Sequence, residues 1–323
     1  MGECCVMCLS HFIALRGPIM SDCPETCVIR VTAAVPRGRT MESWRSALIY
    51  SHARRGYNRV SRGHGSGRRS SMRTLYRAML PYEWRFWLYK QRNRRSVRRL
   101  REAVNESPKG NFSLRRCDEL EAIFVHIPKA AGTSVALSLF GELPFHYTAI
   151  QYRVIFGRSD FRRYFKFAFV RNPWDRLYSA YRYLRAGGWD DKDKAWAEQH
   201  LAPYPDFNAF VLDWLTADNL RAYMHFRPQV EFVCDRRGRP LIDYLGYFET
   251  IEDDFRVVSG RLGTAVTLDH VNASGRADYR SVYSAEAARR VAEVYRRDIA
   301  AFGYAFEGLR SRRRVSGGEF ESA

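Results

Sequence analysis

The chain has 323 residues and a formal net charge of +18 at pH 7, and its length exceeds that of one typical domain. No segment reaches the roughly 18 to 20 apolar residues that cross a bilayer, so the sequence predicts no transmembrane span. The seven cysteines are an odd number and five of them crowd residues 4–27. The number and placement of the cysteines therefore predict no disulfide framework and favour a reducing compartment.

The excess positive charge lies in residues 37–116, which hold 22 Lys and Arg against 4 Asp and Glu. Residues 1–71 lack sustained periodicity and contain the run RRGYNRVSRGHGSGRRSS, so we expect a disordered N-terminal extension. Residues 72–104 read as a helix broken near Pro81, within a basic, aromatic-rich helical segment that ends at 116. This composition fits peripheral contact with an anionic membrane or packing of the aromatics on the domain, and we favour packing.

Residues 123–134 read IFVHIPKAAGTS, a short apolar run that predicts a buried strand followed by a loop and a helix. Gly132 supplies backbone freedom to the loop, and Thr133 or Ser134 can cap the helix. A strand that leads through a tight loop to a helix N-terminus directs backbone N–H groups at one point, where an anion is stabilised. Lys129 lies within this loop, where its ammonium can reach the same anion.

Residues 166–181 read KFAFVRNPWDRLYSAY and repeat the arrangement of a buried strand followed by a helix. Arg171 stands at the carboxyl end of the strand, and Asn172 and Pro173 suit the first positions of the helix. Arg171 and Ser179 are eight residues apart, so both can face one groove beside the first loop. Parallel α/β sheets bind ligands at the carboxyl ends of their strands, which is where both segments place their polar side chains.

The whole pattern predicts a three-layer α/β domain of residues 117–308 with a mainly parallel sheet. The expected strands lie near 122–127, 166–170 and 242–248, and the expected helices near 133–140, 173–185, 207–216, 251–262 and 284–301. The last of these reads YSAEAARRVAEVYRRDIAAFGY, an amphipathic helix that ends at Gly303. Residues 309–323 are expected to form a disordered tail.

The order P-K-x-x-G-T-S differs from a Walker A motif, in which the lysine follows the second glycine. HIPKAAGTS resembles the 5′-phosphosulfate loop of the sulfotransferases, and RNPWDRLYSAY resembles their 3′-phosphate block. The resemblance extends over residues 120–308, to the carbohydrate sulfotransferases grouped as sulfotransferase family 2, and implies a P-loop-like fold. Many relatives have threonine or glycine where this chain has Ala130 and Ala131, so backbone N–H groups must make that sulfate contact.

The resemblance implies the co-substrate 3′-phosphoadenosine 5′-phosphosulfate (PAPS) and transfer of its sulfuryl group to a hydroxyl of a carbohydrate or another acceptor. The residues that it assigns to PAPS are Lys129, Ala130, Ala131, Gly132, Thr133, Ser134, Arg171 and Ser179. Arg280 lies in the family-like segment 269–283, which is expected to fold over the nucleotide. A sulfuryl group carries less negative charge than a phosphoryl group, so lysine and backbone donors can replace magnesium, and we expect no metal.

In this reaction Lys129 stabilises charge on the leaving phosphate oxygen while a general base removes the acceptor proton. His146 is our first choice for the base because its segment, PFHYTAIQY, follows the first helix. His225 is the second choice. His126 lies in the predicted strand and reads as a core residue.

Two other classes of function fit parts of the sequence. One is a nucleotide kinase of the P-loop kind, which the misplaced lysine disfavours. The other is a non-enzymatic protein that binds nucleic acid or a membrane surface through the basic extension, although no recognisable nucleic-acid motif accompanies the charge and no specific nucleic acid is expected. The best apolar stretch, residues 4–15, is too short for a span and follows an acidic residue, so we expect a cytoplasmic, bacterial-type enzyme.

Overall fold

The structure is a computed structural model that describes residues 88, 91, 94–106, 110–268 and 278–322. These residues all fall within one unit of the chain, residues 64–323. The extension predicted at 1–71 and the aromatic part of the segment predicted at 72–116 lie outside the described residues, and both stay predictions. In the part of the chain that is described, no helix is both long enough and apolar enough to cross a membrane.

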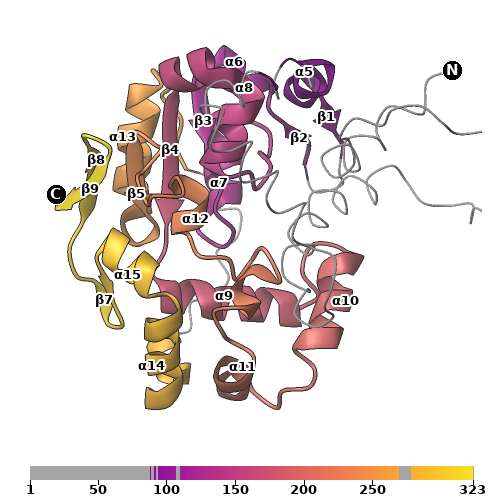
Figure 1. The fold of residues 1–323 in the computed structure, drawn as a ribbon, viewed down its shortest axis with the longest axis vertical. Helices are drawn as coiled ribbons and strands as arrows, with labels where there is room; N and C mark the ends of the chain where they lie inside the picture. Colours follow the sequence, from indigo (N-terminus) through magenta and orange to yellow (C-terminus); the bar gives the residue numbers. More distant parts are fainter. Residues whose placement is uncertain (1–87, 89–90, 92–93, 107–109, 269–277, 323) are drawn as a thin grey trace, which may run out of the picture. The chain divides into compact units, whose positions relative to one another are not determined.

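A three-stranded parallel sheet forms the centre of this region (Figure 1). Its strands, in the order β3-β4-β5, are β3 (Ala122–Phe124), β4 (Phe165–Val170) and β5 (Tyr244–Tyr247). All strand residues except Phe165 and Tyr244 are buried, so both faces of the sheet are covered, as the continuous apolar runs predict. The expectation of a mixed α/β fold with a parallel sheet is confirmed.

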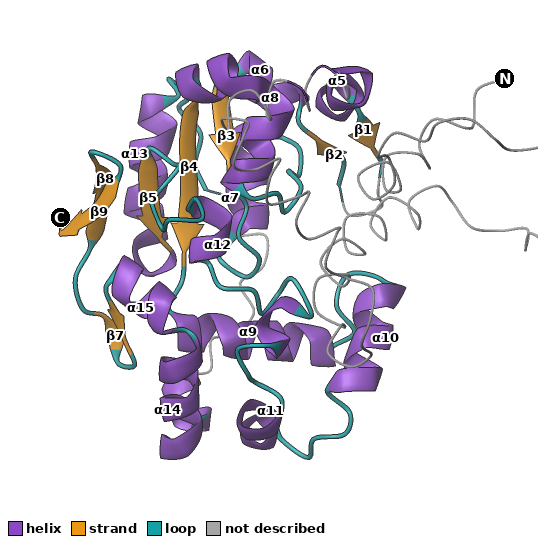
Figure 2. Ribbon diagram, viewed as in Figure 1, coloured by secondary structure: helices purple, strands orange, loops and turns teal. Residues whose placement is uncertain are grey.

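Helices account for most of the remaining described residues (Figure 2). In chain order they begin with α5 (Arg94–Glu102), α6 (Arg115–Glu119), α7 (Gly132–Phe140), α8 (Ala149–Arg163) and α9 (Pro173–Arg185). Those that follow are α10 (Asp191–His200), α11 (Phe207–Asp213), α12 (Val230–Val233), α13 (Ile251–Arg261), α14 (Ala285–Val294) and α15 (Arg296–Phe302). In Figures 1 and 2 the strands point towards α9.

Side-chain caps explain where several of these helices begin. Thr148 forms a capping box with Gln151 at the start of α8. Asn172 accepts hydrogen bonds from two backbone N–H groups at the start of α9, which has the predicted bounds. Asp190, Asp206 and Ser284 cap α10, α11 and α14 in the same way. These polar side chains satisfy backbone N–H groups of the first turn and thereby fix the residue at which each helix begins.

The C-terminal helix differs from its prediction because the single helix expected at 284–301 is divided. The α14 helix ends at Val294, Tyr295 adopts a non-helical backbone conformation, and α15 continues from Arg296 to Phe302. Tyr295 is 1% exposed and its hydroxyl donates to the Phe226 carbonyl at 2.6 Å. This buried anchor fixes the chain at the junction of the two helices.

The segment expected to be a disordered tail, 309–323, forms a hairpin instead, and this prediction is wrong. Strands β8 (Arg313–Ser316) and β9 (Glu319–Ser322) pair antiparallel, after the short pair β6 (Tyr304–Ala305) and β7 (Gly308–Leu309). Gly317 and Gly318 both have positive φ, which a tight two-residue hairpin turn requires. Phe320 packs its ring edge-on against Phe302 and ties the hairpin to α15.

The described end of the basic segment packs on the domain through one arginine. Arg101 of α5 forms ion pairs with Asp118 and, at 3.0 Å, with Asp160 of α8. Its guanidinium also lies 4.9 Å from the centroid of the Phe156 ring. Just after α5, β1 (Val104–Asn105) pairs with β2 (Phe112–Ser113). The packing interpretation concerns the aromatic side chains of this segment, which lie outside the described residues, so it stays a prediction.

Candidate functional site

The loop between β3 and α7 has an unusual backbone. Lys129 and Ala131 both have positive φ, 68° and 59°, which side chains other than glycine rarely adopt. Such strained positions persist where the surroundings hold them, and they cluster at ligand sites. The N-cap of α7 is Ala131, whose side chain makes no capping hydrogen bond, so the prediction that Thr133 or Ser134 is the cap residue is wrong. The first N–H groups of α7 therefore receive no hydrogen bond from the side chain of the N-cap residue.

Gly132 is required at the first position of α7 by the His126 side chain. A Cβ at residue 132 would lie 1.8 Å from a carbon of the His126 ring, which real structures do not allow. The helix N-terminus thus lies directly against a buried imidazole. The sequence predicts that Gly132 supplies backbone freedom to the loop, and this close contact is a further reason for glycine at this position.

The Lys129 ammonium rests on an aromatic face. Its Nζ atom lies 3.8 Å from the centroid of the Tyr183 ring on α9, within the range of a cation–π interaction. Burial and, to a lesser extent, the nearby Arg171 guanidinium lower the pKa of Lys129 to about 8, and Asp193 opposes both effects. An ammonium in this setting is stabilised when a second negative charge enters the site.

Arg171 reaches the same loop from the end of β4. Its Nη1 donates to the Lys129 carbonyl at 3.2 Å. Its Nε and Nη2 donate to the two carboxylate oxygens of Asp175 at 2.8 and 2.7 Å. The guanidinium also lies 4.1 Å from the centroid of the Phe248 ring, which follows β5. These bonds use three of its five N–H groups, so two are left to donate to an anion.

Two buried residues that sequence analysis did not select hold the backbone of this site. Gln229 accepts from the Arg171 N–H at 3.0 Å and donates to the Arg171 carbonyl at 2.8 Å. Asp298 in turn accepts from the backbone N–H groups of Gln229 and Val230 at 2.7 and 3.0 Å. Burial raises the pKa of Asp298 to about 6, because the charged form loses its water. The carboxyl end of β4 is therefore fixed from outside the sheet.

Arg176 supports the backbone next to Lys129 and His225, and it is 1% exposed. It donates to the carbonyls of Pro128 at 2.9 Å, Arg227 at 3.0 Å and His225 at 3.2 Å. It thereby ties α9 both to the loop that contains Lys129 and to the turn after His225. One sequence signal points to it: Arg176 occupies a position on the buried stripe of α9, with Leu177 and Ala180.

The other residues that the sequence assigns to the nucleotide are described by their position and burial. Ser179 lies one helical turn beyond Asp175 on α9 and is half-buried. Ala130 is buried, and Thr133 and Ser134 are half-buried in the first turn of α7. Arg280 is exposed and pairs with Asp278 at 2.8 Å, so the structure does not bring it into contact with Lys129 or Arg171. The segment before it, 269–277, lies outside the described residues.

Three histidines gather beside the loop. The rings of His126 and His146 lie 4.1 Å apart between centroids, and Nδ1 of His146 faces the His126 carbonyl at 3.1 Å. Donation from Nδ1 leaves Nε2 of His146 as the acceptor nitrogen. Burial lowers the pKa of His146 to about 4 and lowers that of His126 well below its usual range. Both imidazoles are therefore neutral near pH 7.

The second candidate base, His225, is 4% exposed and faces a buried carboxylate. Its Nε2 lies 3.6 Å from Asp193, and Tyr223, close to it in the chain, donates to the same carboxylate. Burial lowers the pKa of His225 while Asp193 opposes the change. Asp193 was not selected from the sequence, and no helix was predicted over α10.

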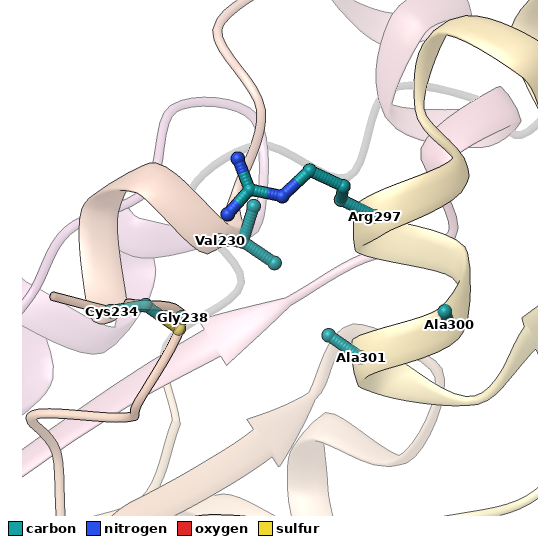
Figure 3. Close-up of a pocket in the computed structure, with 6 residues that line it drawn as sticks. All are labelled: Val230, Cys234, Gly238, Arg297, Ala300 and Ala301. Carbon is teal, nitrogen blue, oxygen red and sulfur yellow. The ribbon is translucent and has the colours of Figure 1, made fainter. Parts of the chain in front are cut away.

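A pocket of about 360 Å³ lies elsewhere, between α12 with its following loop and α15 (Figure 3). Its lining residues are Val230, Cys234, Gly238, Arg297, Ala300 and Ala301, and none of them belongs to the predicted nucleotide site. Among the described residues, no group of three or more His, Cys, Asp or Glu side chains is arranged to hold a metal ion.

Comparison with known proteins supplies the family. Residues 150–305 match the model of the Sulfotransferase family. This match, over slightly less than half of the chain, supports the assignment of residues 150–305 to the sulfotransferase family. The sulfotransferase match contains Arg171, Ser179 and Arg280, and it begins after the Lys129 loop. Membership supports transfer of a sulfuryl group in general.

The chain is also similar to an uncharacterised protein of Archaeoglobus fulgidus. The two are 24% identical over 127 residues, which is 39% of this chain and 91% of the relative. No solved structure matches the chain. The assignment of the Lys129 loop therefore depends on its residues and geometry.

Proposed function

We propose that this protein transfers the sulfuryl group of PAPS to a hydroxyl group, most simply that of a carbohydrate. One observation supports this above the others: the Arg171 guanidinium donates to the carbonyl of Lys129. The resemblance assigns these two cationic residues to the two phosphate-bearing ends of PAPS, and their contact supports placing them in one site. Both follow the carboxyl ends of parallel strands, where such sheets bind nucleotides.

In the proposed mechanism the Lys129 loop binds the 5′-phosphosulfate. The first N–H groups of α7 and the Lys129 ammonium face the oxygen atoms on which charge develops as the sulfur–oxygen bond breaks. Arg171, oriented by Asp175, binds the 3′-phosphate through its two remaining N–H groups, and Ser179 donates to the same phosphate. Positioning of the two partners in line then supplies much of the rate.

His146 is the proposed general base. When His146 Nδ1 donates its proton to the His126 carbonyl, the free lone pair of the neutral ring is on Nε2. The low pKa of His146 keeps the ring neutral at pH 7. The acceptor hydroxyl gives its proton to Nε2 as its oxygen attacks sulfur, and the adenosine bisphosphate leaves. His225, beside Asp193, is the alternative base. The proposal includes no metal ion, because the ammonium, the guanidinium and backbone donors supply the positive charge.

Transfer of labelled sulfate from PAPS to a panel of glycans tests the proposal. We expect transfer by the native protein and a loss of at least about 10²-fold in turnover for Lys129→Ala and for Arg171→Ala, because each removes a charge-stabilising donor. Lys194→Ala and Arg289→Ala change exposed residues of the same types and serve as matched controls. Full turnover by either site variant would show that the assignment is wrong.

A further inference from the structure

Asp193 is a carboxylate buried on α10, with 4% of its surface exposed. Its Oδ2 accepts from the Tyr183 hydroxyl at 2.9 Å and from the Trp189 backbone N–H at 2.8 Å. Its Oδ1 accepts from the Tyr223 hydroxyl and faces His225. A buried carboxylate is costly unless it is fully hydrogen-bonded, and here donors converge on it from several segments of the chain.

This carboxylate is not needed to start its own helix. The N-cap of α10 is Asp190, which already accepts from the N–H groups of Lys192 and Asp193. The chain also leaves room for Asp193, because a Cβ at Gly188 would lie 2.1 Å from the Asp193 Cβ. The surroundings of Asp193 thus point to a role away from the helix terminus.

Tyr183 connects Asp193 to the Lys129 loop. The face of its ring contacts the Lys129 ammonium, with 3.8 Å from Nζ to the ring centroid, while its hydroxyl donates to Asp193. A phenol that donates to a carboxylate has a more electron-rich ring, which strengthens its attraction for a cation. The negative charge of Asp193 also acts directly on the ammonium.

Other charged and titratable groups around Lys129 do not replace this effect. Arg171 repels the ammonium and lowers its pKa, as burial does. Three imidazoles, those of His126, His146 and His225, also interact with Lys129, and each of them is disfavoured in its charged form by the lysine. Asp193 is the carboxylate that opposes these influences.

We propose that Asp193 is a positioning residue of the anion-binding loop. Through the Tyr183 hydroxyl and by its own charge, it keeps the Lys129 side chain protonated and held against the Tyr183 ring. An incoming anionic donor then meets a lysine that is already charged and placed at the mouth of the loop. This inference deepens the proposed function, and its role for the donor rests on that function.

Direct titration of Lys129 in the free protein tests the inference without any donor or acceptor. The chain has six lysines, Lys90, Lys109, Lys129, Lys166, Lys192 and Lys194, so reductive ¹³C-methylation gives a simple NMR spectrum. The Lys129 signal is the one that Lys129→Arg removes. In Asp193→Asn, which keeps the shape but loses the charge, we expect its titration midpoint to move about 1 pH unit lower.

Asp191→Asn removes an exposed carboxylate from the same helix turn and is the matched control, for which we expect no such movement. A folded Asp193→Asn protein with an unchanged Lys129 midpoint overturns the inference. The ring contact is tested separately: the Lys129 methyl signal of the native protein must be shifted upfield by the Tyr183 ring and must lose this shift in Tyr183→Leu. If Asp193→Asn does not fold, this second measurement decides, and a Lys129 signal without the upfield shift in the native protein overturns the inference.

Activity gives a second readout. If the proposed transfer occurs, the alkaline limb of kcat/KM moves to lower pH in Asp193→Asn, whereas a purely structural role lowers the rate equally at every pH. If no transfer occurs in the native protein but the Lys129 midpoint still moves in Asp193→Asn, the proposed function fails while the positioning role stands.

Discussion

At the scale of single residues, Lys129 lies in surroundings that disfavour its protonated, positively charged form. Burial and the Arg171 guanidinium bring its pKa to about 8, so protonation of this lysine changes within the range of ordinary assays. An anion bound to the loop restores the balance, because an opposite charge favours the ammonium. The lysine is thus poised to respond to a phosphate or sulfate group.

Affinity for 3′,5′-adenosine bisphosphate, the product of PAPS, should therefore fall as pH rises through about 8. The protonated lysine binds, its population falls up to tenfold per pH unit above its pKa, and phosphate groups with a second pKa of about 6 are already ionised there. Calorimetry from about pH 7 to about pH 10 measures this fall in affinity. Lys129→Arg keeps its charge throughout and should bind with little pH dependence. The same decline in the arginine variant would assign the titration to another group.

The sequence predicts the residues that lie on loops at this site better than those buried within helices. Lys129 and Arg171 were identified because each follows an apolar strand run. Arg176 and Asp193 were missed because charged residues in such polar segments are normally exposed to solvent. In both cases the charged residue occupies the buried stripe of its helix, beside Leu177 for Arg176 and three residues before Trp196 for Asp193. That spacing was the available signal.

At the scale of elements, α9 connects the parts of the site. Its N-terminus follows Arg171 and its Tyr183 ring contacts Lys129. Its Arg176 donates to the carbonyl of Pro128, which precedes Lys129, and to that of Arg227. Since the loop backbone has strained φ angles at Lys129 and Ala131, it depends on such external bonds to keep its shape.

Arg176→Met should lower the free energy of unfolding by about 3 kcal/mol, because it leaves buried carbonyls without donors. Urea unfolding measures the change, and calorimetry should show weaker binding of the adenosine bisphosphate because the Pro128 carbonyl loses its tie. Arg182→Met changes an exposed arginine of the same helix and is the control. A stability within about 0.5 kcal/mol of the native value would contradict the role given to Arg176.

The strands and several helices could be predicted from periodicity, since their apolar runs match buried positions closely. Helix α8 could not, because Gly157 interrupts it with a non-helical backbone and its arginines blur the stripe. The β8–β9 hairpin was hidden by its charged strands, although the Gly317–Gly318 pair marks the turn. Its cross-strand partners, such as Val315 with Phe320, follow only from the folded register.

At the scale of the whole molecule, the excess charge and the proposed site occupy different parts of the sequence. Residues 37–116 hold the positive excess, whereas residues 117–323 have 29 Lys and Arg against 28 Asp and Glu. The family match covers residues 150–305 and contains Arg171, while Lys129 lies before it. The contact between Arg171 and Lys129 therefore connects the region that matches the family with the loop that precedes it.

Calorimetric titration with 3′,5′-adenosine bisphosphate in the presence of EDTA tests that contact most directly. We predict tight binding by the native protein without magnesium, a large loss of affinity in both Lys129→Ala and Arg171→Ala, and native affinity in Lys194→Ala. Binding that needs magnesium and prefers ATP, or unchanged affinity in either site variant, would contradict the conclusion that Lys129 and Arg171 hold one adenosine donor.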